Sequence, residues 1–229
     1  MIGQILNKFI GKDRFKKMNQ VVLGINVKLY GKKALMIIDE EVKKVGAPYW
    51  LMFGTMLGAV REHNFIKNDS DIDLGMFSKD LTPTFIKHLQ SRGFTYREVK
   101  MSSDKRLRMV KFFYHRIPID FYGFAYDEPG SNKITGLLTK PLEGKNWQES
   151  LKTNTLRACL VHLEYEGTTD CDFNGITLKI PVNAHDFLRK HYGEDYLIPQ
   201  VGNKGGASSV MEIMPLEKLS ASLVSIDEL

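Results

Sequence analysis

The sequence predicts an α+β fold in which one mixed β-sheet is flanked by helices, with further helical segments at both ends. The chain has 229 residues, of which 43% are hydrophobic and 26% charged, as is usual for a globular protein with a sizeable core. Segments with helical spacing of apolar residues alternate with short strand-like apolar runs. Several consecutive strands have tight connections, which favours a sheet containing antiparallel pairs.

The helices are indicated by their apolar spacing and by residues typical of helix ends. Residues 33–44 place apolar side chains on one side, and Gly46 follows as a stop. Thr82 and Pro83 are typical of an N-cap and a first helical residue. The expected helices span residues 33–44, 55–63, 83–91 and 184–192.

The strands are short apolar or alternating segments bounded by turn-forming residues. His115-Arg116 leaves room only for a tight connection between two of them. Asn174-Gly175 indicates a two-residue hairpin, because both residues accept a positive φ. Beyond Asp127 the spacing of apolar residues becomes less regular, so we assign no further strand of defined bounds there. The expected strands span residues 49–53, 71–76, 94–100, 107–114 and 117–124.

We expect a catalytic domain over residues 31–204, preceded by a basic segment, 1–30, and followed by a loosely attached tail, 205–229. Residues 1–33 carry eight Lys or Arg residues and one acid, whereas the rest of the chain is slightly acidic. Apolar residues recur at helical spacing near the start. They are Ile2, Ile5, Leu6, Phe9 and Ile10.

A basic amphipathic segment of this kind can lie on an anionic membrane or dock on the protein core, and the sequence supports both interpretations equally. Nucleic-acid binding is not expected, since no basic stripe with interleaved aromatic residues is present. No segment has the pattern of a membrane span or a signal peptide. The two cysteines, Cys159 and Cys171, are too few for a disulfide framework. We therefore expect a cytoplasmic location, with peripheral association at the inner face of the membrane through residues 1–30.

Three aspartates form the most informative pattern in the chain. Asp71 and Asp73 alternate along one strand, so their side chains share a face, while Asp120 points away from the buried side of another strand. Carboxylates held this close repel one another unless a cation lies between them, and Mg²⁺ binds through one or two carboxylates together with substrate phosphates. A pair of aspartates at a solvated strand end is the alternative. The third aspartate and the preceding glycine turn favour a catalytic Mg²⁺ site, in which Mn²⁺ is a substitute ion, with Asp120 as a ligand or a base.

The residues around these acids suggest how a phosphate would bind. Gly54 and Thr55 open a predicted helix, where backbone N–H groups and the helix dipole favour an anion. Arg61, on the same helix, is either a phosphate contact or an exposed salt-bridge residue. Asp69 adds negative potential or hydrogen-bonds the loop. Together these parts predict a phosphoryl- or nucleotidyl-transfer enzyme.

The same residues resemble the signature of the LicD/fukutin-related family. The similar stretches are residues 53–61, Phe65-Ile66, residues 69–76 and Ile119-Asp120-Phe121, followed by residues 180–183 and 192–196. The resemblance covers residues 33 to 200. It implies a nucleotidyltransferase-type fold with metal ligands at Asp71, Asp73 and Asp120 and donor contacts at Gly54, Thr55 and Arg61.

The resemblance further implies a phosphotransferase that moves a phospho-substituent, such as phosphocholine or ribitol phosphate, from a CDP-linked donor to a cell-surface glycan and releases CMP. The acceptor would be a glycan or a lipid-linked glycan. This chain departs from the family where Lys67-Asn68-Asp69-Ser70 stands in place of Pro-Trp-Asp-Asp, and where Tyr196 replaces a tryptophan. The altered loop leaves the donor's identity open.

Two other functions fit the same residues. A conventional nucleotidyltransferase would use an NTP and release pyrophosphate through the same carboxylates. A non-catalytic nucleotide- or glycan-binding module would keep the fold alone, although retention of all three acids argues against it.

Overall fold

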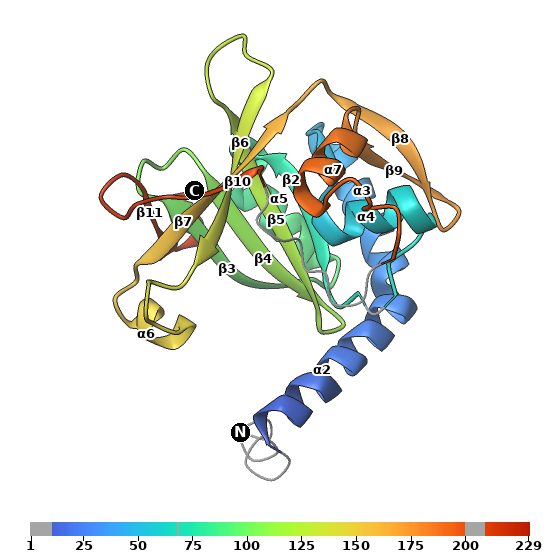
Figure 1. The fold of residues 1–229 in the computed structure, drawn as a ribbon, viewed down its shortest axis with the longest axis horizontal. Helices are drawn as coiled ribbons and strands as arrows, with labels where there is room; N and C mark the ends of the chain where they lie inside the picture. Colours follow the sequence, from blue (N-terminus) through green and yellow to red (C-terminus); the bar gives the residue numbers. More distant parts are fainter. Residues whose placement is uncertain (1–10, 68, 200–208) are drawn as a thin grey trace.

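The computed structural model describes residues 11–67, 69–199 and 209–229. Its helices are α2 (Lys12–Asn26), α3 (Lys32–Val45), α4 (Phe53–Glu62), α5 (Pro83–Ser91), α6 (Trp147–Lys152) and α7 (Ala184–Tyr192), with shorter turns η1 (Val27–Gly31), η2 (Ser78–Asp80) and η3 (Ile226–Glu228). The strands are β1 (Tyr49–Leu51), β2 (Ile72–Phe77), β3 (Thr95–Ser102), β4 (Arg108–Tyr114), β5 (Ile117–Tyr126), β6 (Lys133–Lys140), β7 (Leu156–Glu164), β8 (Thr168–Phe173), β9 (Ile176–Pro181), β10 (Met211–Ile213) and β11 (Ser220–Val224). The fold is therefore mixed α+β, as predicted (Figure 1).

Nine of the described strands form one sheet, and β8 and β9 form a separate hairpin. The sheet order runs β1-β2-β5-β4-β3-β11-β7-β10, and β6 pairs with both β5 and β7. The pairings of β5, β4, β3, β11, β7 and β6 therefore close into a ring. Strands β2 and β5 are parallel, whereas the other strand pairs of the described residues are antiparallel.

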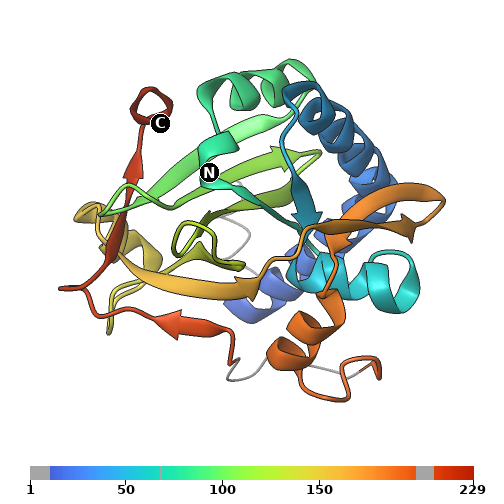
Figure 2. The ribbon, with the colours of Figure 1, turned by 90° about the horizontal axis from the view of Figure 1, so that it is seen from above.

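Helices α3 and α5 lie along one side of the sheet, where Figure 2 shows them in blue and green-teal. Phe85 of α5 packs edge-on against Phe121 of β5, with ring centroids 5.4 Å apart. Glu41 of α3 is buried and accepts a hydrogen bond from Arg92 at the end of α5. This helix pair covers the hydrophobic side of the central strands and leaves their opposite side for polar residues.

The predicted helix and hairpin signals are confirmed where they rest on local geometry. Gly46 ends α3 in the left-handed conformation, and the Thr82 side chain caps α5 by accepting from the Phe85 N–H. Asn174 and Gly175 both have a positive φ between β8 and β9. These ends depend on a few neighbouring residues, so sequence alone predicts them.

The turn before α4 differs from the expectation. The strand was expected to reach residue 53 and the helix to begin at Thr55, but β1 ends at Leu51 and α4 begins at Phe53. Phe53 itself has a φ of 42°, a strained conformation for a bulky residue. Its ring packs against those of Tyr122, Phe187 and His191. This aromatic packing holds the strained turn in place.

The structure also differs from the prediction at both ends of the chain. The boundary placed after residue 30 falls inside η1, which joins α2 and α3 into one helical run. The C-terminal segment was expected to be helical and, from residue 205 onward, loosely attached, but it contains two strands that join the sheet: β10 pairs with β7, and β11 lies between β3 and β7. The predicted apolar residues between Ile2 and Ile10 lie outside the described residues. In the part of the chain that the structure describes, no helix combines the length and apolar character needed to cross a membrane.

Candidate active site

The parallel pairing of β2 and β5 places two predicted aspartates side by side. In this register Asp73 lies opposite Asp120. The neighbours Ile72 and Leu74 are fully buried, so strand alternation turns Asp73 to the other face of the sheet. The side chain of Asp120 is likewise opposite to those of Ile119 and Phe121, which are fully buried. The two carboxylates therefore lie on the same face of adjacent strands.

Several hydrogen bonds fix the position of Asp73. Its backbone N–H donates to the hydroxyl oxygen of Thr55 at 3.0 Å, and its carbonyl accepts from the N–H of Met52 at 2.9 Å. The Tyr122 hydroxyl donates to Asp73 Oδ1 at 2.9 Å. Gly75, two residues further along β2, passes so close to the buried ring of Trp50 that an added Cβ would lie 2.1 Å from the indole nitrogen. The strand that carries Asp73 is thus held from both sides.

Asp120 is paired with a lysine on the neighbouring strand. Lys111 of β4 lies opposite Asp120 in the register, and its Nζ donates to Asp120 Oδ2 at 2.9 Å. The other carboxylate oxygen, Oδ1, is buried and has no hydrogen-bond partner among the described residues. Burial raises the pKa of the Asp120 carboxyl, and Lys111 opposes this shift. One oxygen of Asp120 therefore accepts from a lysine, while the other has no hydrogen-bond donor among the described residues.

Asp71 and Asp69 complete a cluster of four carboxylates. Burial raises the pKa of Asp71, and the charge of Asp120 raises it further. Burial also raises the pKa of Asp69 to about 7, with a contribution from Asp71. For Asp73, burial and then the charges of Asp71 and Asp120 raise the pKa well above its usual range. Burial is the main effect that disfavours the ionised forms of these four acids, and repulsion between neighbouring carboxylates adds to it for Asp69, Asp71 and Asp73.

This donor set fits a divalent cation. Hard cations such as Mg²⁺ bind carboxylate oxygens, and an ion would neutralise the mutual repulsion. Asp69 Oδ2, like Asp120 Oδ1, is buried without a hydrogen-bond partner in the described chain. Among the described residues no three acidic, histidine or cysteine side chains form a ready-made metal cluster. The ligands are therefore of the right chemical type, but their coordination geometry is not preformed.

The residues predicted to hold the donor phosphate lie around this cluster but differ in their contacts. Gly54 faces Asp69, whose Oδ1 would lie 3.7 Å from an added Cβ. Thr55 is buried and uses its hydroxyl to hold the Asp73 backbone, so its side chain supports the acid rather than the phosphate. Arg61 pairs with Glu62 at 2.7 Å and donates to the Tyr196 carbonyl at 3.4 Å. The guanidinium therefore connects α4 to the segment after α7.

Three residues of the site were not predicted from the sequence. They are Lys111, Tyr122 and Tyr192. The pKa of Tyr192 is raised by burial and by the charges of Asp73, Asp69 and Asp71, which places its phenol within electrostatic reach of the cluster. For Lys111 a signal was present in the sequence, because the two-residue turn at His115-Arg116 brings residue 111 opposite residue 120. No comparable signal places Tyr122 or Tyr192.

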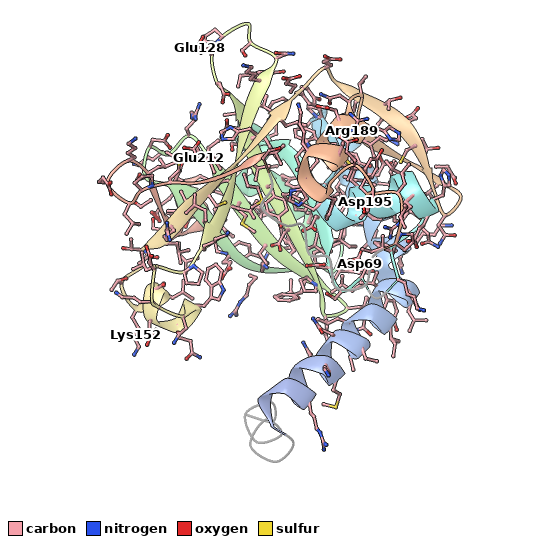
Figure 3. All side chains as sticks on the ribbon, in the orientation of Figure 1. Asp69, Glu128, Lys152, Arg189, Asp195 and Glu212 are labelled. Carbon is pink, nitrogen blue, oxygen red and sulfur yellow. The ribbon has the colours of Figure 1, made fainter. Side chains whose placement is uncertain are left out.

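The acid cluster lies beside the junction between the N-terminal helix and the rest of the molecule. Figure 3 labels Asp69 at this junction, on the opposite side of the molecule from Lys152 of α6. A cavity of about 360 Å³ is lined by Asp69 and Ile66 and, from the helix, by Val27, Lys28 and Lys32. A second cavity of about 390 Å³ lies between β6, β7 and α7, and none of the four acids lines it.

Comparison with known proteins agrees with the class that this site suggests. Residues 46–183, more than half of the chain, match the family model described as LicD/FKTN/FKRP, nucleotidyltransferase domain. The chain therefore belongs to the LicD/FKTN/FKRP family. The match contains all four acids and the helix α4.

Curated relatives of known name are also similar to this chain. It is 25% identical over 168 residues to the ribitol-5-phosphate transferase FKTN of Mus musculus, and 24% identical to the proteins of the same name from Macaca fascicularis and Homo sapiens. Each of these matches covers 73% of this chain. The chain spans about a third of the length of these relatives, 33% in each case.

Proposed function

We propose that this protein is a Mg²⁺-dependent phosphotransferase of nucleotidyltransferase-like fold. It moves a phospho-substituent from a CDP-linked donor to a hydroxyl group of a cell-surface glycan, or of its lipid-linked precursor, and releases CMP. The observation that carries the proposal is the alignment of Asp73 with Asp120 on parallel strands, with Asp71 beside them, within the segment that matches the family model. The names of the relatives support transfer of a polyol phosphate.

The reaction is a displacement at the phosphorus distal to the nucleoside. The oxygen of the acceptor hydroxyl forms a new P–O bond, and the bond from that phosphorus to the bridging oxygen breaks, so that CMP leaves with the electron pair. The acceptor hydroxyl loses its proton to a carboxylate of the cluster or to water. No net oxidation occurs, and cleavage of the donor's phosphoanhydride bond supplies the driving force for the transfer.

The residues of the chain position these groups. Asp71, Asp73 and Asp120 would hold Mg²⁺, with Mn²⁺ as a substitute, and the ion would supply charge neutralisation to the donor phosphates. Tyr122 and Thr55 keep Asp73 in place through the hydrogen bonds described above. Lys111 fixes one oxygen of Asp120, and the other is buried without a hydrogen-bond partner among the described residues, so it would be available to the ion. The N-terminal end of α4 presents backbone N–H groups next to Asp69, where a donor phosphate would be favoured once the acids are neutralised.

A product analysis tests the proposal directly. The purified chain is incubated with Mg²⁺, a glycan acceptor and a panel of CDP-linked polyols and amino alcohols, and the small product is identified. We expect CMP to form only with an acceptor present and to disappear on chelation of the ion. Release of pyrophosphate from an NTP would instead support a conventional nucleotidyltransferase, and nucleotide binding that is independent of Mg²⁺ would support a non-catalytic module.

A further inference from the structure

The N-terminal helix carries an apolar stripe on its outward side. Its members lie three or four residues apart in α2 and η1, so they share one side of the helix. We call these residues the outer stripe. They are Met18, Val21, Ile25 and Leu29, with exposed fractions of 44%, 63%, 50% and 66%.

The opposite side of this helix explains why the outer stripe is not part of the core. Val27 is buried, and Gly31 lies so close to Phe65 that an added Cβ would be 2.7 Å from its ring. Tyr30 stacks on His115 with centroids 4.0 Å apart, and Asn26 donates to the His115 carbonyl. These contacts attach the end of the helical run to the body, while α2 extends away from it (Figure 1). The helix is therefore apolar on two sides, and only one of them is used within the fold.

The charge around the outer stripe is strongly positive. Residues 12–31 contain five Lys or Arg residues and one acid, Asp13. Of the basic side chains that the structure describes, Arg14, Lys17 and Lys28 are exposed. An apolar side with basic flanks is the pattern of a helix that lies in the interface of an anionic membrane.

We propose that the outer stripe docks on the surface of an anionic lipid bilayer, with Met18, Val21, Ile25 and Leu29 inserted between headgroups. A second copy of this chain is the competing occupant, because a stripe with this spacing can also pair two helices. The flanking charges disfavour it, since a symmetric pair would bring the same cations face to face with Asp13 as the single acid within residues 12–31 to compensate. This inference does not depend on the proposed activity.

Docking in this manner would also orient the acid cluster. Lys28 lies between Ile25 and Leu29 of the outer stripe and lines the 360 Å³ cavity that Asp69 also lines. Because Val27 also lines this cavity, the cavity lies on the side of the helix that faces the body, away from the outer stripe.

Vesicle flotation with the full chain tests the proposal. The lipids are phosphatidylcholine alone and phosphatidylcholine with about one third phosphatidylglycerol, each at low and high salt. The test variant combines Val21→Gln, Ile25→Gln and Leu29→Gln, because glutamine removes the apolar group and keeps helix propensity. A matched control replaces three exposed apolar residues elsewhere with glutamine, namely Val182, Leu197 and Ile198.

We expect the wild type and the control to bind the anionic vesicles, more weakly at high salt, and the stripe variant to bind them roughly tenfold or more weakly. Unchanged thermal unfolding of the stripe variant would show that it is folded. Equal binding by the stripe variant and the wild type, or no binding by the wild type, would overturn the proposal. A wild-type dimer in sedimentation velocity that the stripe variant converts to a monomer, without lipid binding, would assign the stripe to a second copy instead.

Discussion

Asp73 occupies a position that folding alone does not favour. Its carboxyl is buried beside other acids, and burial, with a further contribution from the charges of Asp71 and Asp120, raises its pKa well above the usual range. Its backbone and side chain nevertheless receive hydrogen bonds from Thr55 and Tyr122. An arrangement that costs stability while its supports are retained is typical of a functional site.

We expect Asp73→Asn to lower turnover by about 10³-fold or more, because an amide oxygen is a poor ligand for a divalent cation. Stability without added metal should stay the same or increase, since the amide removes a buried charge and can still accept from Tyr122. Turnover and thermal unfolding measured on the same sample check both parts. Glu217→Gln, an exposed acid far along the sequence, is the control for loss of one charge.

Lys111 gives a second expectation at this scale. Lys111→Met should destabilise the protein by about 2 kcal/mol, because Asp120 keeps a buried charge without its partner. In the double variant with Asp120→Asn, more than half of this loss should be recovered, since both partners are then neutral. Chemical denaturation of the four proteins in the absence of metal measures the coupling. Additive losses would show that the ion pair does not contribute to stability.

The individual site residues differ in how far the sequence predicts them. Alternation along strands predicts Asp71, Asp73 and Asp120, and the structure places Asp73 and Asp120 on one face of the sheet, with Asp71 just before β2. The position of Lys111 opposite Asp120 can be predicted by counting residues outward from the two-residue turn at 115–116. The role of Thr55 cannot be predicted in this way, because its hydroxyl accepts from the backbone of Asp73, eighteen residues away in sequence.

At the scale of elements, helix α7 packs against the turn at the start of α4. Phe187 and His191 lie one turn apart on α7, and both rings pack against Phe53. Burial lowers the pKa of His191 to about 4, because the protonated ring would lose its hydration. The aromatic cluster thus stabilises the strained Phe53 only while His191 is neutral.

This histidine predicts a pH dependence of stability. The unfolded chain binds a proton near pH 6.5 and the folded chain only near pH 4, so stability falls as the pH is lowered through this interval. We expect His191→Phe to remove up to about 2 kcal/mol of this loss, given the partial exposure of the ring. Denaturation curves at several pH values between 4 and 7 measure the slope. A slope that the substitution leaves unchanged would assign the acid sensitivity to other groups.

The elements that the sequence predicts are those with local signals. Helices α3, α5 and α7 and the hairpins at residues 115–116 and 174–175 have caps or turn residues within a few positions. Strands β6, β7, β10 and β11 lack such signals and exist because they pair with distant strands. Long-range pairing of this kind cannot be read from periodicity within a short window.

At the scale of the whole molecule, the closure of the sheet depends on the last described strand. β11 pairs with β3 on one side and with β7 on the other, although its paired positions in β3, from Ser102 (with Ala221) to Val99 (with Val224), lie 119 to 125 residues earlier in the sequence. Ala221 of β11 is buried in a second hydrophobic cluster together with Leu107, Leu137 and Leu156. The end of the chain therefore joins the two halves of the sheet and fills the space between them.

Ala221→Asp should consequently destabilise the whole protein by at least about 3 kcal/mol, because a carboxylate would be buried in an apolar cluster. The matched control is Ser225→Asp, in the same segment, where the residue is exposed and caps η3. Aspartate is a good N-cap, so this control should stay within about 0.5 kcal/mol of the wild type. Thermal unfolding followed by circular dichroism, which reports the strands and helices together, measures both. If Ala221→Asp melted like the control, β11 would be a detachable strand and the sheet would be stable without its closure.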